Sequence, residues 1–444
     1  MAKLIHDNLN AGGGSERLAI ATIELLNEMG FIVDVETCNN NLEVKELEKF
    51  FGHLNIRIRQ IKQLDIFSLF LNSNKGVDTD THCQYDLIIN THGDLLPYFS
   101  ERVHGSAFTA NGIGMGNNNN SKKPIRITYC HHPLVPYYLK VSKGEYEKFL
   151  NRLIEASQPK YSRMNIPIGE LLSNVPSLYY LMINNTIILT NSEFSKKHIK
   201  RLYNAVEPIT LSPPVDVQTF RKAALYSKER QDIILVLSRI SPDKEIENAI
   251  RVAKILSDKK VGEKMIIVGN ISKDKLDYLL LLNDMIIDYS LKNYVKLEVG
   301  VSFEKLLSLI SKSKVYLHPL AGEPFGISVA EAMAAGLIPI VPSVGGNSEF
   351  VPEQYHYRTL EEAAEKIQHA LLAWKNNNDN AISEQEVRIN LSNLVLRFSI
   401  ESYKNNLRNI ISSLVKEKEI TLLNPTLNTQ NIKQEKRKTG ALFT

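Results

Sequence analysis

Cysteine is scarce in this chain. The 444 residues include three cysteines, Cys38, Cys83 and Cys130, and no two of them form a C-x-x-C pair. An odd and widely spaced set argues against a disulfide framework and offers no zinc-ligand spacing. Because free thiols of this kind persist in reducing compartments, we expect a cytoplasmic protein.

Long apolar runs are also missing. No stretch of about 18 consecutive apolar residues occurs, so we expect no transmembrane helix. The first residues, Met1–Asn8, contain no apolar core of a signal peptide. The lack of a long apolar segment is still compatible with peripheral attachment at the cytoplasmic surface of a membrane.

Neither sign of charge dominates. The chain carries 53 Lys and Arg against 49 Asp and Glu, a formal net charge of +4. A nucleic-acid-binding protein would concentrate basic residues far more strongly, so we expect no nucleic-acid partner. The length of 444 residues, with 43% hydrophobic residues, is too great for one core and predicts two domains.

Short apolar segments alternate with amphipathic ones throughout the chain. In the first half we predict strands at residues 3–6, 31–36, 86–90, 125–130 and 186–190. A helix is predicted over residues 15–29, after the glycine run 12–14. Ser15 would be its N-cap and Gly30 would end it.

The second half repeats this alternation more regularly. The predicted strands are 233–237, 265–268, 295–299, 315–317 and 338–341, and the predicted helices are 245–257, 273–288, 303–311, 327–335 and 360–375. Strands of this length alternating with helices predict an α/β protein with two doubly wound, Rossmann-like domains facing across a cleft. Ligands bind outside the carboxyl ends of the strands in such sheets.

Two prolines, Pro213 and Pro214, mark the predicted domain boundary. We expect an N-terminal domain at 1–215 and a C-terminal domain at 216–383. Residues 384–416 are predicted to form a helix that packs back on the N-terminal domain. The polar residues 417–444 are predicted to be a disordered tail.

The segment Glu323–Gly336 contains the strongest indication of chemistry. A predicted strand runs into a loop, and a helix rich in small residues then begins near Gly326. The first amides of a helix have no partner within it and lie at its positive end, which suits a diphosphate. Glu323 could accept hydrogen bonds from sugar hydroxyls, and Glu331 from a ribose. Taken alone, a helix-start acid and a solvated glutamate explain the same two residues.

The alanines that surround Glu331 favour the first interpretation. They indicate a closely packed helix, inside which a glutamate needs a partner. The spacing Glu323-x7-Glu331, with Pro-Phe-Gly between, resembles the donor-site signature of the GT4 family of retaining glycosyltransferases, which have the GT-B fold. The segments 190–195, 212–216, 238–244 and 345–346 resemble further GT4 segments in the same order, so the resemblance covers residues 1 to about 410.

The resemblance implies that 1–215 is the acceptor-side domain and 216–383 the nucleotide-sugar-binding domain, and it implies a role for each matching residue. Arg239 and Lys244 would neutralise the diphosphate leaving group, Glu323 would bind the transferred sugar, and Glu331 would bind the ribose. The donor-binding set is Gly13, Gly14, Arg239, Lys244, Glu323, Phe325, Gly326, Ile327 and Glu331. We expect catalysis without a metal or other cofactor, by front-face attack without a protein nucleophile. Ser238 and Glu245 stand where the family has glycines, which weakens the assignment of Lys244.

The glycine run could instead belong to a dinucleotide-binding fold. The pattern Gly12-x-Gly14-x-x-Arg17 lacks its third glycine, so NAD binding is disfavoured. The string 10–17 resembles the N-terminal loop of the α1,2-mannosyltransferases of lipid-linked oligosaccharide synthesis, and 129–133 resembles a second segment of them. The resemblance makes GDP-mannose the leading donor, with UDP-sugars still open, and implies a glycan or lipid-linked acceptor.

Three histidines are expected near the cleft. His92 follows the strand 86–90, and in the family a histidine at this location contacts the transferred sugar near the reacting centre. His131 and His132 follow the strand 125–130 and could contact the acceptor. For each of the three, a loop histidine bonded to the backbone is the alternative.

A lipid-linked acceptor would require a membrane-facing patch. Residues 134–160, with Lys140, Lys143 and Lys148, could supply one, although a packed helix with solvated lysines explains them too. Two other functions also stay open, a sugar-nucleotide epimerase of the same fold and a catalytically silent sugar-nucleotide-binding partner protein. The presence of the clamp and glutamate residues argues against the silent partner.

Overall fold

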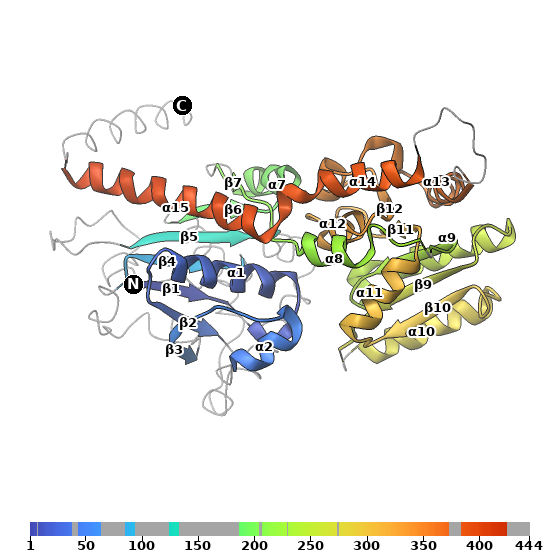
Figure 1. The fold of residues 1–444 in the computed structure, drawn as a ribbon, viewed down its shortest axis with the longest axis horizontal. Coiled ribbons are helices and arrows are strands. Elements are labelled where there is room, and N and C mark those ends of the chain that lie inside the picture. The colour runs from blue at the N-terminus through green and yellow to red at the C-terminus, as the bar shows by residue number, and fades with distance from the viewer. Residues whose placement is uncertain are drawn as a thin grey trace, which may run out of the picture.

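The computed structural model describes residues 1–6, 8–37, 43–63, 85–93, 124–132, 186–203, 207–228, 230–272, 275–372 and 383–423. These residues form two lobes, each built on one parallel sheet, as the sequence predicts (Figure 1). The predicted membrane-facing segment 134–160 lies outside the described residues.

The N-terminal lobe contains a seven-stranded sheet of order β3-β2-β1-β4-β5-β6-β7. Its strands are β1 Ala2–Ile5, β2 Val33–Thr37, β3 Ile58–Gln63, β4 Leu87–Asn90, β5 Ile125–Cys130, β6 Ile187–Thr190 and β7 Ile209–Thr210. Its helices include α1 Gly14–Glu28, α2 Val44–Phe51 and α7 Glu193–Tyr203. All residues of β1 and β4 are buried, as is typical of parallel strands with both faces covered.

The C-terminal lobe contains a six-stranded sheet of order β10-β9-β8-β11-β12-β13. The strands are β8 Ile233–Leu237, β9 Lys264–Gly269, β10 Val295–Val299, β11 Val315–Leu317, β12 Ile338–Pro342 and β13 His356–Tyr357. The helices are α8 Val217–Ala224, α9 Ile246–Asp258, α10 Leu276–Asp288, α11 Phe303–Lys312, α12 Ile327–Ala334 and α13 Leu360–Leu372. Three of these strands, β8, β10 and β11, have the predicted bounds.

Each sheet has one place where the strand order reverses. In the N-terminal lobe it lies between β1 and β4, and in the C-terminal lobe between β8 and β11. The loops that leave such a pair of strands diverge and open a crevice at the carboxyl ends. Because Ile5 pairs with Asn90, His6 and Thr91 lie side by side at this crevice. The corresponding crevice in the other lobe lies between the loops that carry Arg239 and Glu323.

The C-terminal segment differs from the prediction in two respects. One helix was expected over 384–416, but two are present, α14 Glu384–Leu394 and α15 Ile400–Leu423. Between them Phe398 packs against Phe325 and Phe350, with ring centroids 5.0 and 5.1 Å away. The helix also continues through residues 417–423, which were assigned to the disordered tail, because lysine, glutamate and leucine are good helix formers. Residues 424–444 lie outside the described residues.

Helix α15 lies along the N-terminal lobe (Figure 1). The Tyr403 hydroxyl is 2.8 Å from Thr22 Oγ1, and Lys404 Nζ donates to Glu28 at 2.7 Å. Leu407 and Ile411 belong to the same apolar core as the buried residues of α1, so the contact is both apolar and polar. The chain therefore crosses between the lobes twice, once before α8 and once before α15. The two crossings touch, since the Val215 amide donates to the Phe398 carbonyl at 2.8 Å.

The start of α1 differs from the prediction too. Gly13, not Ser15, is the N-cap, and Glu16 supplies the capping group because its Oε2 accepts from the Gly13 amide at 2.6 Å. The Ser15 hydroxyl instead donates to Glu16 Oε1 at 2.7 Å. Gly30 has a φ of 84° just after the helix, so the predicted end is confirmed.

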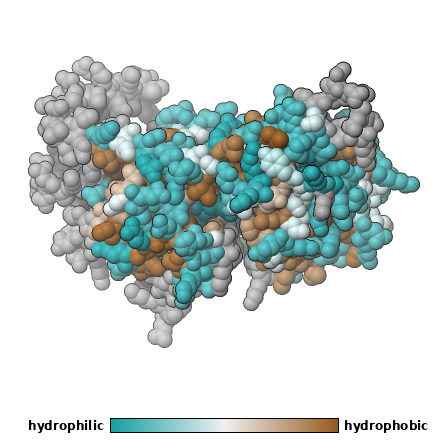
Figure 2. All heavy atoms as spheres, in the orientation of Figure 1, coloured by the Kyte–Doolittle hydropathy of each residue, from teal (hydrophilic) through white to brown (hydrophobic). Residues whose placement is uncertain are grey.

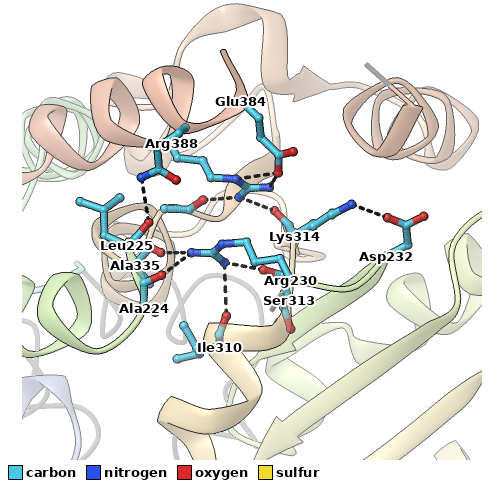
Figure 3. A network of polar contacts seen from close by, with 12 residues as sticks. Ala224, Leu225, Arg230, Asp232, Ile310, Ser313, Lys314, Ala335, Glu384 and Arg388 are labelled. Carbon is cyan, nitrogen blue, oxygen red and sulfur yellow. Dashed lines mark hydrogen bonds and ion pairs between the residues drawn. The ribbon is translucent and has the colours of Figure 1, made fainter. Parts of the chain in front are cut away.

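Two arginines, the buried Arg388 and the half-buried Arg230, hold the far end of α12 (Figure 3). Arg388 is 1% exposed, pairs with Glu384 and donates to the carbonyls of Gly336 and Lys314. Arg230 donates to the carbonyls of Ala335, Ala224 and Ser313 at 2.6, 2.7 and 2.5 Å. These carbonyls lie at or just beyond the C-terminal ends of α8, α11 and α12, where no helical partner exists. The network thus fixes the helix whose opposite end faces the cleft.

Hydrophilic side chains predominate on the face shown in Figure 2, and hydrophobic ones gather in separate patches over both lobes. Helix α10 exposes Leu276, Leu280 and Ile287, at 51%, 62% and 49%. Within the part of the chain that the structure describes, no helix is both long enough and apolar enough to cross a bilayer.

Candidate functional site

Two loops of the C-terminal lobe are joined side by side at the cleft. One follows β11 and carries Glu323, and the other follows β12 and carries Gly345 and Gly346. The Gly346 amide donates to the Glu323 carbonyl at 2.7 Å, and the Gly322 amide donates to Val344 at 2.8 Å. These backbone bonds fix the position of Glu323 independently of any ligand.

The Glu323 carboxylate already has a cationic partner. Its Oε2 lies 2.9 Å from Lys244 Nζ and 3.6 Å from His318 Nε2, and its side chain is 15% exposed. Burial by itself would raise the pKa of Glu323, but His318 and the Lys244 charge outweigh it and hold the pKa below its usual range. Glu323 is therefore an anion at neutral pH, available to accept hydrogen bonds.

Lys244 and Arg239 belong to the loop between β8 and α9. Glu245 ends the turn with a φ of 49°, in the left-handed region, which explains why the family has glycine there. The Glu245 carboxylate accepts from Asn248 at 3.0 Å, while Lys244 pairs with Glu323. Arg239 is different, because its side chain is 70% exposed and pairs with the exposed Asp243 at 3.1 Å. Such a surface pair is weak, so the Arg239 side chain can turn towards a ligand at little cost.

Helix α12 starts at the cleft. Its N-cap Gly326 has a φ of 94° and supplies no side-chain cap. The other predicted residues here differ in their surroundings: Ile327 is partly buried, and the Phe325 ring packs 5.3 Å from that of Phe350. What Phe325 and Gly326 can offer a ligand is therefore their backbone, at the positive end of the helix.

Glu331 lies farther along α12 and faces the N-terminal lobe. Burial raises its pKa to about 7, an effect that Arg17 counteracts and Asp216 reinforces. Arg17 comes from α1 and lies 3.4 Å from Asp216 Oδ2, and Asp216 in turn caps α8 through the Thr219 amide. The N-terminal lobe thus places a cation in the surroundings of Glu331.

The glycine run contacts the donor helix directly. A Cβ added at Gly14 would lie 2.4 Å from the Ile327 Cδ1 atom, so a residue without a side chain permits this approach of the lobes. The Gly13 amide is occupied by Glu16, which also lies 3.3 Å from His6 Nε2. Burial would raise the pKa of Glu16, but its bonds to His6 and Ser15 lower the pKa to about 2. The Gly13 amide is therefore not available to a phosphate in this arrangement.

The histidines lie around the same crevice. The His92 amide donates to Asn90 Oδ1 at 2.9 Å, and its ring lies edge-on to His6, 5.4 Å away. His131 Nε2 lies 2.9 Å from the Thr91 carbonyl, so this nitrogen donates to the backbone. Burial lowers the pKa of both His131 and His132 to about 4, with the His198 charge adding to the effect at His132. Both rings are neutral at pH 7.

The two lobes also touch at the start of α7. The Ser192 hydroxyl donates to the Pro324 carbonyl at 2.6 Å. Glu349 of the C-terminal lobe accepts from the amides of Glu193 and Phe194 at 3.0 and 2.5 Å, and so caps a helix of the other lobe. These contacts hold the N-terminal lobe against the loop that carries Glu323.

The structure brings some of the predicted residues together and leaves others apart. Lys244 contacts Glu323, and Gly14 meets Ile327, but Arg239 extends into solvent. The sequence analysis gave no role to His6, Glu16, Arg17, Ser192, His318, Asn347 and Glu349. A signal existed for some of them, because Glu16 and Arg17 belong to the string 10–17 and Ser192 to the segment 190–195. The described ranges contain no group of three or more His, Cys, Asp or Glu side chains placed to hold a metal ion.

Residues 217–388 match the sequence profile of the family described as "Glycosyl transferases group 1". A protein from Dictyostelium discoideum named "GDP-Man:Man(3)GlcNAc(2)-PP-Dol alpha-1,2-mannosyltransferase" is 22% identical, over 97% of this chain and 86% of its own length. The Homo sapiens protein of the same name is 25% identical, over 77% of this chain and 72% of its own length. These matches confirm the predicted resemblance to GT4 enzymes and favour neither an epimerase nor a silent partner.

Solved structures match the fold. The crystal structure of Anabaena HepE in complex with UDP superimposes with a TM-score of 0.60 at 15% identity, covering 93% of this chain and all of that one. At this identity the match concerns the fold alone, and it confirms the predicted GT-B architecture.

Proposed function

We propose that this chain, a glycosyltransferase whose residues 217–388 belong to the glycosyl transferases group 1, transfers a hexose from a nucleotide sugar with retention of configuration. The best candidate is mannose from GDP-mannose, and the acceptor is a glycan or a lipid-linked glycan. One observation carries the proposal: Lys244 and Glu323, 2.9 Å apart, pair beside the start of α12.

The pair indicates how the donor would be oriented, with its diphosphate at Lys244 and its sugar at Glu323. A diphosphate at the N-terminal end of α12 would attract Lys244, and the exposed Arg239 can turn to the same group. Once Lys244 binds phosphate, the Glu323 carboxylate is released to accept hydrogen bonds from the sugar hydroxyls. The same two cations then stabilise the charge that develops on the leaving diphosphate.

The chemical step needs no nucleophile from the protein. The acceptor hydroxyl oxygen bonds to the anomeric carbon on the face from which the diphosphate oxygen departs, and its proton passes to that oxygen. One C–O bond forms as another breaks, and the configuration is retained. His92 follows β4 at the opposite side of the cleft, where it can contact the sugar near the reacting carbon.

The proposed sugar and acceptor are inferred from the names of proteins with similar sequences. Two proteins similar to this chain over most of its length carry GDP-Man and PP-Dol in their names. A lipid-linked acceptor would bring the enzyme to the cytoplasmic surface of a membrane. The UDP in Anabaena HepE is the reason to include UDP-sugars in the test.

Thermal unfolding against a panel of GDP-, UDP- and ADP-sugars tests the proposal. A donor at 100 times its Kd should stabilise the protein by about 2.7 kcal/mol. We expect GDP-mannose to give the largest shift, and NMR of the product of the transfer reaction to show an α-linkage. A product of inverted configuration, or no shift with any sugar nucleotide, would contradict the proposal.

Donor binding should depend on pH through Glu331. Its pKa is raised to about 7, so the carboxylate that would accept from ribose hydroxyls is mostly protonated at pH 6 and mostly ionised at pH 8. Affinity for the sugar nucleotide should therefore rise about ten-fold between these values, following the ionised fraction. Both phosphates of a sugar nucleotide are esterified and do not titrate in this range. Calorimetric titration of Glu331→Gln should give weak binding without this slope, and a sloping profile in the variant would assign the pH dependence elsewhere.

A further inference from the structure

Asn347 lies in the short turn Gly346–Glu349 that follows β12, and its side chain is completely buried. Neither Oδ1 nor Nδ2 has a hydrogen-bond partner among the residues that the structure describes. Native proteins leave few buried polar groups unpaired, because such a group loses its bonds to water and gains none in return. This amide therefore calls for a partner that the described residues of the chain do not supply.

Two glycines lie close to the Asn347 side chain. A Cβ added at Gly326 would lie 3.1 Å from Asn347 Cβ, and one added at Gly345 would lie 3.0 Å from Oδ1. Both glycines have a positive φ, 94° and 138°, in the loops that follow the adjacent strands β11 and β12. These loops leave the carboxyl ends of neighbouring parallel strands, where ligands bind in such sheets.

The chemistry of the amide indicates which part of the donor it contacts. A carboxamide both accepts and donates, and a sugar hydroxyl does the same, so each can satisfy the other. A diphosphate would be matched by cations, and Arg239 and Lys244 already supply these. Glu323 is the carboxylate of the neighbouring loop, joined to Asn347's own loop through the bond from Gly346 to the Glu323 carbonyl.

We infer that Asn347 is a further donor-site residue whose amide hydrogen-bonds hydroxyls of the transferred sugar beside Glu323. The inference rests on the proposed function, since it assigns one more contact to the same sugar. It also assigns a role in donor selection, because hydroxyls that point away from Asn347 leave its amide unpaired.

The N-terminal lobe lies against the loop that carries Asn347. The Ser192 hydroxyl bonds the Pro324 carbonyl, and a Cβ at Gly346 would lie 2.9 Å from Ser192 Oγ. Glu349, two residues beyond Asn347, caps α7 of that lobe. A sugar would therefore reach Asn347 when these contacts separate, and its hydroxyls would then pair with the buried amide.

Asn347→Leu tests the inference, because leucine fills a similar volume without polar atoms. We expect the Tm of the donor-free protein to stay the same or rise, and calorimetric affinity for GDP or UDP to change less than two-fold. Affinity for the whole sugar nucleotide should fall about ten-fold or more. Asn347→Ala, which is too small to crowd Gly326 and Gly345, should show the same loss if leucine does not fit.

Asn283→Leu is the matched control, since Asn283 is exposed on α10 of the same lobe. It should change neither Tm nor donor affinity. A lower Tm of both Asn347 variants with unchanged sugar-nucleotide affinity would overturn the inference and assign the amide to the fold through a bound water. If the wild-type protein binds nucleoside diphosphates and sugar nucleotides equally well, Asn347 does not contact the sugar. If it binds neither, the proposed function fails and this inference with it.

Discussion

Glu323→Gln is expected to lower kcat/KM for sugar transfer by about 100- to 1000-fold. Glutamine keeps the shape of the side chain but removes the charge that pairs with Lys244 at 2.9 Å. It would also weaken the hydrogen bonds that sugar hydroxyls donate to the carboxylate, since bonds to an ionised acceptor are stronger. Release of nucleoside diphosphate in the presence of acceptor measures the effect.

The control for this prediction is Glu353→Gln, because Glu353 is an exposed glutamate of the same lobe. It should leave turnover within two-fold. Lys244→Met should cause a similar loss, and the double variant should be little worse than either single one, because residues that act as a unit are not additive. Glu323→Gln with more than a tenth of wild-type activity would show that the pair is not the donor site.

Arg388→Ala is expected to reduce the free energy of unfolding of the C-terminal lobe by about 3–5 kcal/mol. The guanidinium is buried, and its removal leaves Glu384 without its partner and the Gly336 and Lys314 carbonyls without their donor (Figure 3). Arg230 lies nearby, and burial followed by the Arg388 charge lowers its pKa to about 9. Urea unfolding followed by far-UV circular dichroism measures the loss.

Two further substitutions test how much of this loss comes from the planar guanidinium and how much from the loss of any arginine in this lobe. Arg388→Lys keeps a charge but not the planar fork, and should recover only part of the stability. Arg358→Ala removes an exposed arginine of the same lobe and should change the unfolding free energy by less than about 0.5 kcal/mol. A loss below about 1 kcal/mol for Arg388→Ala would mean that water replaces the guanidinium, and that α12 is held by its apolar face alone.

The apolar strands could be predicted because their signal is local. Three correctly predicted strands are Ile233–Leu237, Val295–Val299 and Val315–Leu317. Each is short, apolar or alternating, and flanked by turn residues, so the local sequence is enough to predict it as a strand. Two of the elements that the sequence analysis missed are more polar. Strand β3 reads Ile-Arg-Gln-Ile-Lys-Gln at the sheet edge, and α7 contains four lysines and arginines among its 11 residues, so neither shows the pattern of a buried element.

The break between α14 and α15 shows why one helix was predicted where two exist. The local preference for helix continues across residues 395–399, but Phe398 packs between two phenylalanines and its carbonyl accepts from Val215. Those contacts come from segments far away in sequence, and they outweigh a propensity of a few tenths of a kcal/mol per residue.

The sequence by itself determined the two parallel sheets and the loop that begins with Glu323, because periodicity, small residues and turn residues act over a few positions. Only the tertiary structure decided which side chains meet there. Lys244 and Glu323 are 79 residues apart in the chain. Arg17 reaches the surroundings of Glu331 from the other lobe, and the Asn347 amide is buried without a hydrogen-bond partner among the described residues. Such pairings depend on where loops end in space, which no local pattern encodes.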